Sequence, residues 1–187
     1  MTVNIIDMVF LKPFKGASCN KMKTKLNLKL IAVLVLSVIL FTACGEKPED
    51  YRAQLEEKDV TYSEESFVEQ GKNGEQENVE LFLKAGMDPE VTDHNGNTAL
   101  MLAAMNGHVD TMKLLLEQGS EVNAKNNLGK TALFYAATNG HVEAVEVLLD
   151  NDADVTVKTE NGRTALDYAK QRGHTDVVEL LENTEKE

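Results

Sequence analysis

The stretch GNTALMLAAMNGHVDTMKLLLEQG, residues 96–119, decides the fold because its landmarks return downstream at a constant interval. GNTAL at 96–100 recurs as GKTAL at 129–133 and as GRTAL at 162–166, with a spacing of 33 residues both times. NGH at 106–108 recurs as NGH at 139–141 and as RGH at 172–174. A fixed period of this size is typical of a repeat array.

Each repeat predicts two short helices joined by a turn. A threonine can cap the first helix, and a glycine in the left-handed conformation can end it. The second helix is expected to run through residues 114–116 and their equivalents, and to end at Gly119 in one repeat and at Asp152 in the next. A polar, hairpin-like connection then leads onward. The threonines and glycines are Thr98, Thr131, Thr164, Gly107, Gly140 and Gly173.

These units resemble the ankyrin repeat, whose pattern begins G-x-T-P-L-H, continues A-A-x-x-G-H and ends with L-L and G-A. The resemblance covers about 65–187 and implies an all-α ankyrin-repeat solenoid of four helix-turn-helix repeats with β-hairpin-like connecting loops. The chain departs from the pattern at two positions of each repeat. Alanine replaces the proline at Ala99, Ala132 and Ala165, and the first histidine is replaced by Met101, Phe134 and Asp167.

A degenerate first unit emerges 33 residues before the clear ones. Phe67 aligns with Leu100 and Gly74 with Gly107, whereas Gln70-Gly71 replaces the alanine pair, as expected for an end repeat with no neighbour before it. Glu182 replaces a leucine at the other end, which also fits a solvated cap. The expected ankyrin-repeat domain is 62–187, with repeats at about 62–92, 93–125, 126–158 and 159–187.

The first 43 residues resemble a bacterial lipoprotein signal peptide. Leu30–Ala43 is an uncharged run of 14 residues, shorter than the roughly 20 needed to span a bilayer, and lysines precede it. LFTAC at 40–44 resembles a lipobox, which implies an acylated N-terminus at Cys44; Phe41 departs from the usual leucine. An uncleaved anchor or plain export is the alternative. Because residues 22–43 form a compact signal alone, the true start is expected at Met22.

Charge divides the chain at the same boundary. The whole chain has a net charge of −12, but residues 44–187 hold 13 Lys or Arg and 30 Asp or Glu, a net of −17. An acidic protein lacks the basic surface that nucleic acid requires. Residues 44–61, polar and acidic, are expected to form a lipidated tether. A flexible coil is the first expectation there, with a helical turn or two over 53–58 as the alternative.

Two clusters of residues have the residue types of a metal site, but neither has the spacing or the ligands that a metal ion requires. His108, His141 and His174 share one repeat position, but stacked helices lie about 8–10 Å apart, too far for neighbouring histidines to share a zinc ion. The resemblance implies a structural turn with a hydrogen bond to the backbone. The acidic run at 150–154 imitates a calcium loop, yet Val155 and Asn161 stand where glycine and glutamate are needed. No catalytic motif is present, and we expect neither an enzyme nor a cofactor.

The resemblance implies a concave, partner-binding surface made of hairpin tips and the exposed side of each first helix. Of 18 such positions, five are cationic and one is acidic, against a strongly acidic body. This pattern favours a partner that presents carboxylates, although the repeat register alone could also place lysines there. The expected contact residues are His94, Asn95, Asn97, Met105, Asn106, Asn127, Leu128, Lys130, Thr138, Asn139, Asn161, Arg163 and Arg172.

Together these features predict a protein-binding module, monomeric and tethered by lipid to the bacterial cell envelope, facing the periplasm or the cell exterior. The glycine directly after the cysteine, Gly45, resembles the residue at that position in lipoproteins that are sent to an outer membrane. A sharper version is an inhibitor or immunity-type protein. The alternative is an envelope scaffold or stress-protection protein that assists a periplasmic enzyme. The sequence does not name the partner protein.

Overall fold

The computed structural model describes residues 47–184, so the predicted signal peptide and Cys44 lie outside the described residues. Nine helices and no named strand occupy this range, which confirms the all-α prediction. None of these helices is long and apolar enough to cross a membrane. The helices are α2 (Pro48–Glu57), α3 (Glu64–Asn73), α4 (Gln76–Lys84), α5 (Ala99–Asn106), α6 (Val109–Glu117), α7 (Ala132–Asn139), α8 (Val142–Asp150), α9 (Ala165–Arg172) and α10 (Thr175–Thr184).

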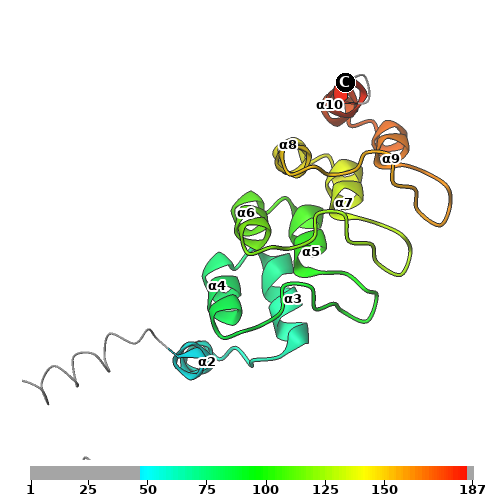
Figure 1. Ribbon diagram of the computed structural model, residues 1–187. Helices are drawn as coiled ribbons and strands as arrows, with labels where there is room; N and C mark the ends of the chain where they lie inside the picture. The colour runs from blue at the N-terminus through cyan, green and yellow to red at the C-terminus, as the bar shows by residue number, and fades with distance from the viewer. Residues whose placement is uncertain (1–46, 185–187) are drawn as a thin grey trace, which may run out of the picture. The chain divides into compact units, whose positions relative to one another are not determined.

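The helices of residues 64–184 form two rows, as Figure 1 shows. Helices α3, α5, α7 and α9 pack one on the next in chain order, and α4, α6, α8 and α10 form the second row. The loops that lead into α5, α7 and α9 project on the side away from the second row. Each helix pair thus packs mainly against the pairs before and after it, which is the arrangement of a solenoid.

The predicted helix caps are confirmed. The hydroxyls of Thr98, Thr131 and Thr164 each accept a hydrogen bond, at 3.3 Å, from the backbone N–H three residues on. The glycines that end α5, α7 and α9 have φ between +72° and +79°, the left-handed region. Asp152 takes the place of Gly119 with φ of +62° and is one of two described non-glycine residues in that region.

The connections between repeats are hairpin-like, as expected. An isolated antiparallel bridge joins Thr92 and Thr98 in the first of them. Hydrogen bonds also join neighbouring hairpins. The N–H of Asn127 donates to the carbonyl oxygen of Asn95 at 3.1 Å, and the N–H of Glu160 donates to the carbonyl oxygen of Leu128 at 3.1 Å. The hairpins at 92–98, 125–131 and 158–164 are therefore stacked by backbone hydrogen bonds.

The interface between the first-row helices requires very small residues. The alanine pairs 103–104 and 136–137 have no exposed surface. In the first repeat, Gly71 holds this place and is buried, although the sequence suggested a polar residue at a free end. A Cβ atom on Gly71 would lie 2.8 Å from the Cβ of Ala99, so glycine permits the close approach of α3 to α5. Gly71 thus faces the following repeat, while no described first-row helix precedes α3, as expected for an end repeat.

The coil expected within residues 45–61 is instead largely helix. Pro48 begins α2, and the Asp50 carboxylate accepts a hydrogen bond from the N–H of Lys47 at 3.0 Å. Leu55 is fully buried in the core, and α2 packs on α4. Tyr51 lies four residues before Leu55, on the same side of the helix, and packs against the core as well. This helix covers the first end of the second row, so residues 48–57 do not form the flexible coil that was expected.

Candidate functional site

A cleft of about 550 Å³ opens between the first hairpin, residues 92–98, and the first-row helices α3, α5 and α7. Its apolar floor consists of Val68 from α3, Leu102 and Met105 from α5, and Tyr135 from α7. Val68 and Leu102 are almost completely buried, whereas Met105 and Tyr135 are half-buried. We call this feature the N-terminal cleft. Its floor can accept an apolar side chain of a partner.

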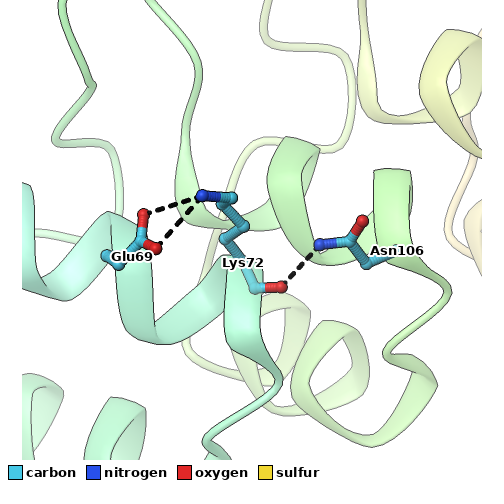
Figure 2. A network of polar contacts seen from close by, with 3 residues as sticks. All are labelled: Glu69, Lys72 and Asn106. Atoms are coloured by element: carbon cyan, nitrogen blue, oxygen red, sulfur yellow. Dashed lines mark hydrogen bonds and ion pairs between the residues drawn. The ribbon is translucent and has the colours of Figure 1, made fainter.

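Acidic side chains dominate the rim of the N-terminal cleft. Glu65 and Glu69 line it from α3, together with the cation Lys72. The Lys72 ammonium lies 3.1 Å from both carboxylate oxygens of Glu69, and the backbone carbonyl of Lys72 accepts a hydrogen bond from the Asn106 amide at 2.7 Å (Figure 2). Both side chains of this ion pair are about half exposed, so the pair contributes little stability. Its main effect is to hold two charged groups at the mouth of the cleft.

Three polar residues spaced by 33 close the bases of the three hairpins. An oxygen of Asp93 accepts hydrogen bonds from the backbone N–H groups two and four residues on, at 2.8 and 2.9 Å. Asn126 repeats this pattern at 3.0 and 2.9 Å. The Thr159 hydroxyl instead donates to the carbonyl of Arg163 at 3.1 Å. These contacts fix the hairpin conformation and, with it, the position of the tip residues.

Asn97 belongs to this support and not to the exposed surface. It is 6% exposed, and its amide donates to the second oxygen of Asp93 at 2.9 Å. Its carbonyl oxygen accepts from the Asn126 amide at 2.7 Å and from the Tyr135 hydroxyl at 3.0 Å. These bonds give Asn97 a supporting role in the hairpins; it also lines the N-terminal cleft, and its contact with a partner stays a prediction. The residue joins the first hairpin to the second hairpin and to α7.

Two groups at the N-terminal cleft have shifted pKa values. Burial alone would raise the pKa of Asp93, but hydrogen bonds from the Asn97 amide and from the backbone of Asn97 and Asn95 outweigh burial and hold this pKa below its usual value. Burial raises the pKa of the Tyr135 phenol; the hydrogen bond from Asn126 opposes this rise, and the Asp93 charge adds to it. Asp93 therefore stays charged and Tyr135 stays neutral around pH 7.

Cations mark the other part of the surface. The Lys130 ammonium lies 4.9 Å from the ring centre of Phe134, and the Arg163 guanidinium lies 5.7 Å from that of Tyr168. Arg163 also donates to the side-chain oxygen of Gln171 at 2.6 Å. We call Lys130, Lys158, Arg163 and Arg172 the basic end of the surface. The aromatic and amide contacts orient Lys130 and Arg163.

Most of the predicted contact residues are exposed. Leu128 is 48% exposed and is the one large hydrophobic side chain among the described residues that is classed as exposed. Met105, Lys130 and Thr138 are half-buried, so the fold uses part of each side chain. The other exposed members of the predicted set are His94, Asn95, Asn106, Asn127, Asn139, Asn161, Arg163 and Arg172.

The structure brings only part of the predicted set together at the cleft. His94, Asn95 and Met105 line it, as does the buried Asn97. Asn139 ties α7 to α5 through a 2.8 Å hydrogen bond from its amide to the carbonyl of Met105. The equivalent bond from Asn106 ties α5 to α3. These two asparagines therefore support the packing of the helices as well as facing solvent.

Sequence reasoning missed several residues that line the N-terminal cleft. Leu102 precedes Met105 by three residues, so the helical period places both on one side of α5. The same register, 33 residues apart, gives Glu69 on α3 and Tyr135 on α7. These positions could have been found by extending the repeat pattern along the helices and back into the first unit.

The histidine ladder is structural. The Nε2 atom of His141 lies 3.0 Å from the carbonyl oxygen of Met105. The Nε2 atom of His174 lies 2.9 Å from the carbonyl oxygen of Thr138. Each of these rings thus bridges to the preceding repeat, which confirms the hydrogen bond to the backbone for these two residues. In the described range 47–184, no three His, Cys, Asp or Glu side chains gather closely enough to hold a metal ion.

Family comparisons agree with this architecture. Residues 69–159 match a family model for ankyrin repeats in three copies, and residues 140–182 match a second one for ankyrin repeats in many copies. With the paired helices described above, these matches show that the described part of the chain forms an ankyrin-repeat solenoid. Ankyrin repeats are protein–protein interaction modules and are generally not enzymes. A comparison with curated protein sequences found no significant match.

Proposed function

We propose that this protein is a membrane-tethered binding module of a bacterial cell envelope, facing the periplasm or the cell exterior, and that it recognises a partner protein through its concave surface. By concave surface we mean the three hairpins together with the N-terminal cleft and the basic end. Lipidation at Cys44 supplies the tether. The solenoid supplies stoichiometric recognition without chemistry of its own.

The observation that carries this proposal is the position of Leu128. Leu128 lies at a hairpin tip, is 48% exposed and does not belong to the hydrophobic core. It lies two residues before Lys130, whose ammonium is held over the rings of Phe134 and Tyr135. An apolar residue beside an oriented cation is a typical centre of a binding surface, where a few residues carry most of the energy.

The experiment uses residues 46–187 as bait in an envelope extract. These residues form one compact unit that contains the whole described core, Leu55 to Leu181. Lys130→Glu combined with Arg163→Glu is expected to abolish capture of the partner, because the double change adds repulsion as well as removing attraction. Lys113→Glu, an exposed residue of α6 in the second row, is the matched control and should leave capture unchanged.

Equal capture by the double variant and the wild-type protein would reject the concave surface. Loss of capture in the Lys113→Glu control alone would move the site to the second row of helices. Once a partner is isolated, its activity separates two versions of this function. Stoichiometric loss of that activity identifies an inhibitor or immunity-type protein, and unchanged or increased activity identifies a scaffold or stress-protection protein.

A further inference from the structure

We infer that the partner presents one extended segment in which an apolar residue stands beside a basic residue and an acidic residue follows several positions away. This inference deepens the proposed function and rests on it. The concave surface changes sign along the stack. The basic end, which begins at Lys130 beside Tyr135 of the cleft floor, favours carboxylates, as the sequence indicated, whereas the N-terminal cleft is acidic along α3 and has an apolar floor.

The carboxylates available to a partner at the N-terminal cleft belong to α3. Asp93 also lines the cleft, but both of its oxygens already accept hydrogen bonds within the hairpin. Glu65 and Glu69 are exposed, and Lys72 neutralises only part of their charge by pairing with Glu69. A cationic side chain of the partner would be attracted here, next to an apolar side chain seated on the cleft floor.

Lys130 and Arg163 define the opposite requirement. Lys130 lies over two rings of α7, and Arg163 lies near a ring of α9. Both cations point to a carboxylate on the partner, and the planar guanidinium of Arg163 can bind it through two parallel hydrogen bonds.

The spacing of the helices sets the length of the segment. Packed helices lie about 8–10 Å apart, so α7 is roughly 16–20 Å and α9 roughly 24–30 Å from α3. An extended chain advances about 3.3 Å per residue. The acidic residue should therefore lie about five to nine residues from the basic one. A second copy of this chain is disfavoured as the occupant, because two concave surfaces cannot pack closely on each other.

Two capped peptides of identical composition test the inference. In the matched peptide, an arginine pair flanks a leucine and a glutamate pair lies about seven residues away. In the scrambled peptide, the glutamate pair flanks the leucine and the arginine pair is distant. Titration of isotopically labelled residues 46–187 at low salt should show about fivefold tighter binding of the matched peptide, as expected for two or three exposed ion pairs. Amide shifts should change along α3, α5 and α7.

Glu65→Lys combined with Glu69→Lys should remove this preference, and the neutral pair Glu65→Gln and Glu69→Gln should reduce it if the lysine variant folds poorly. Glu143→Lys, an exposed residue of α8, is the matched control and should retain the preference. Equal binding of the two peptides would overturn the inference. So would a preference that survives in the glutamine variant, or a dimer of the chain that the same variants dissolve.

Capture of the natural partner separates this inference from the proposed function. If the Glu65 and Glu69 variants capture the partner as well as wild type while the Lys130 and Arg163 variant does not, the acidic cleft is not used and the proposed function stands. If both variants capture it equally well, recognition through the concave surface is wrong.

Discussion

Asn97 shows how one side chain can join three parts of the surface. Its amide group bonds to the first hairpin through Asp93, to the second hairpin through Asn126 and to α7 through Tyr135. Because these bonds are buried, a partner group left without its hydrogen bond would lower the free energy of unfolding. The residue thus holds the N-terminal cleft, which it also lines, in shape.

Replacing Asn97 with alanine should lower the free energy of unfolding by about 1–3 kcal/mol, because the Asn126 amide and the Tyr135 hydroxyl lose a buried acceptor. Urea denaturation of residues 46–187 measures the change. Asn95→Ala in the same hairpin alters an exposed side chain and should stay within about 0.5 kcal/mol of wild type. A similar loss in both variants would show that the hairpin, and not the buried amide, is responsible.

The repeat register predicted the position of Asn97 in its hairpin but not the buried hydrogen bonds that it makes. Residues 97, 130 and 163 share one backbone position, and the sequence therefore suggested one common surface. The long side chains of Lys130 and Arg163 reach the rings of the first-row helices with a charged group. The short amide of Asn97 instead bonds within the loop. A periodic pattern identifies the backbone position, whereas side-chain length and bonding partners decide what the residue does there.

Helix α2 is the element that sequence patterns concealed. It lies outside the 33-residue period, and its composition is that of a solvated linker, with mainly charged residues around Tyr51 and Leu55. The other helices carry threonine caps, terminal glycines or repeated leucines, which is why their existence could be predicted. Tyr51 and Leu55 pack against the core at helical spacing, and an ion pair of 2.7 Å between Lys58, at the end of α2, and Glu77 of α4 adds to the contact. No repeat signal marks such a contact.

Leu55→Ala should therefore destabilise the domain by about 2–5 kcal/mol, as should Leu148→Ala in α8, because each leucine is fully buried and leaves a cavity when it is shortened. Thermal and urea unfolding of residues 46–187 measure both. Gln54→Ala changes an exposed side chain of α2 and should have little effect. If Leu55→Ala behaves like Gln54→Ala, α2 does not belong to the folded unit and the flexible tether is correct.

At the scale of the whole molecule, three carboxylates in hairpins and helix caps make the free energy of unfolding depend on pH. The pKa of Asp93 is lowered by bonds that outweigh its burial, that of Asp154 by the hydroxyl and N–H of Thr156, and that of Asp167 mainly by the N–H of Thr164. A carboxylate whose folded pKa lies below the unfolded value stabilises the protein above the unfolded pKa, here about 3.8. That stabilisation is lost as the pH falls through the folded values.

The urea midpoint should accordingly fall between pH 5 and pH 3, and Asp93→Asn should reduce the size of the fall. Asparagine can accept the same two backbone hydrogen bonds, as Asn126 does in the next hairpin, but it does not titrate. Urea titrations at several pH values measure the slope for both proteins. A midpoint that does not change over this range would contradict the assigned pKa directions.

Cys44→Ser should release the protein from the membrane fraction, because the proposed tether depends on acylation of that cysteine. Fractionation followed by salt and carbonate washing measures the release. A serine variant that remains in the washed membranes would identify Leu30–Ala43 as an anchor. Gln54→Ala, which changes an exposed side chain of α2, is the control and should stay in the membrane fraction.

The stacked architecture also determines how the molecule gains and loses its structure over time. Among the side-chain hydrogen bonds between described repeats, the one from Tyr135 to Asn97 joins the residues farthest apart in sequence, 38 positions. The helices of each row make their principal contacts with the next helix of the same row and with their partner in the pair. Contacts between segments so near in sequence close small loops, which favours rapid folding. Because neighbouring repeats supply most of each interface, the stack can open from either end while α5 and α7 remain in place. Under a pulling force the domain would peel one repeat at a time.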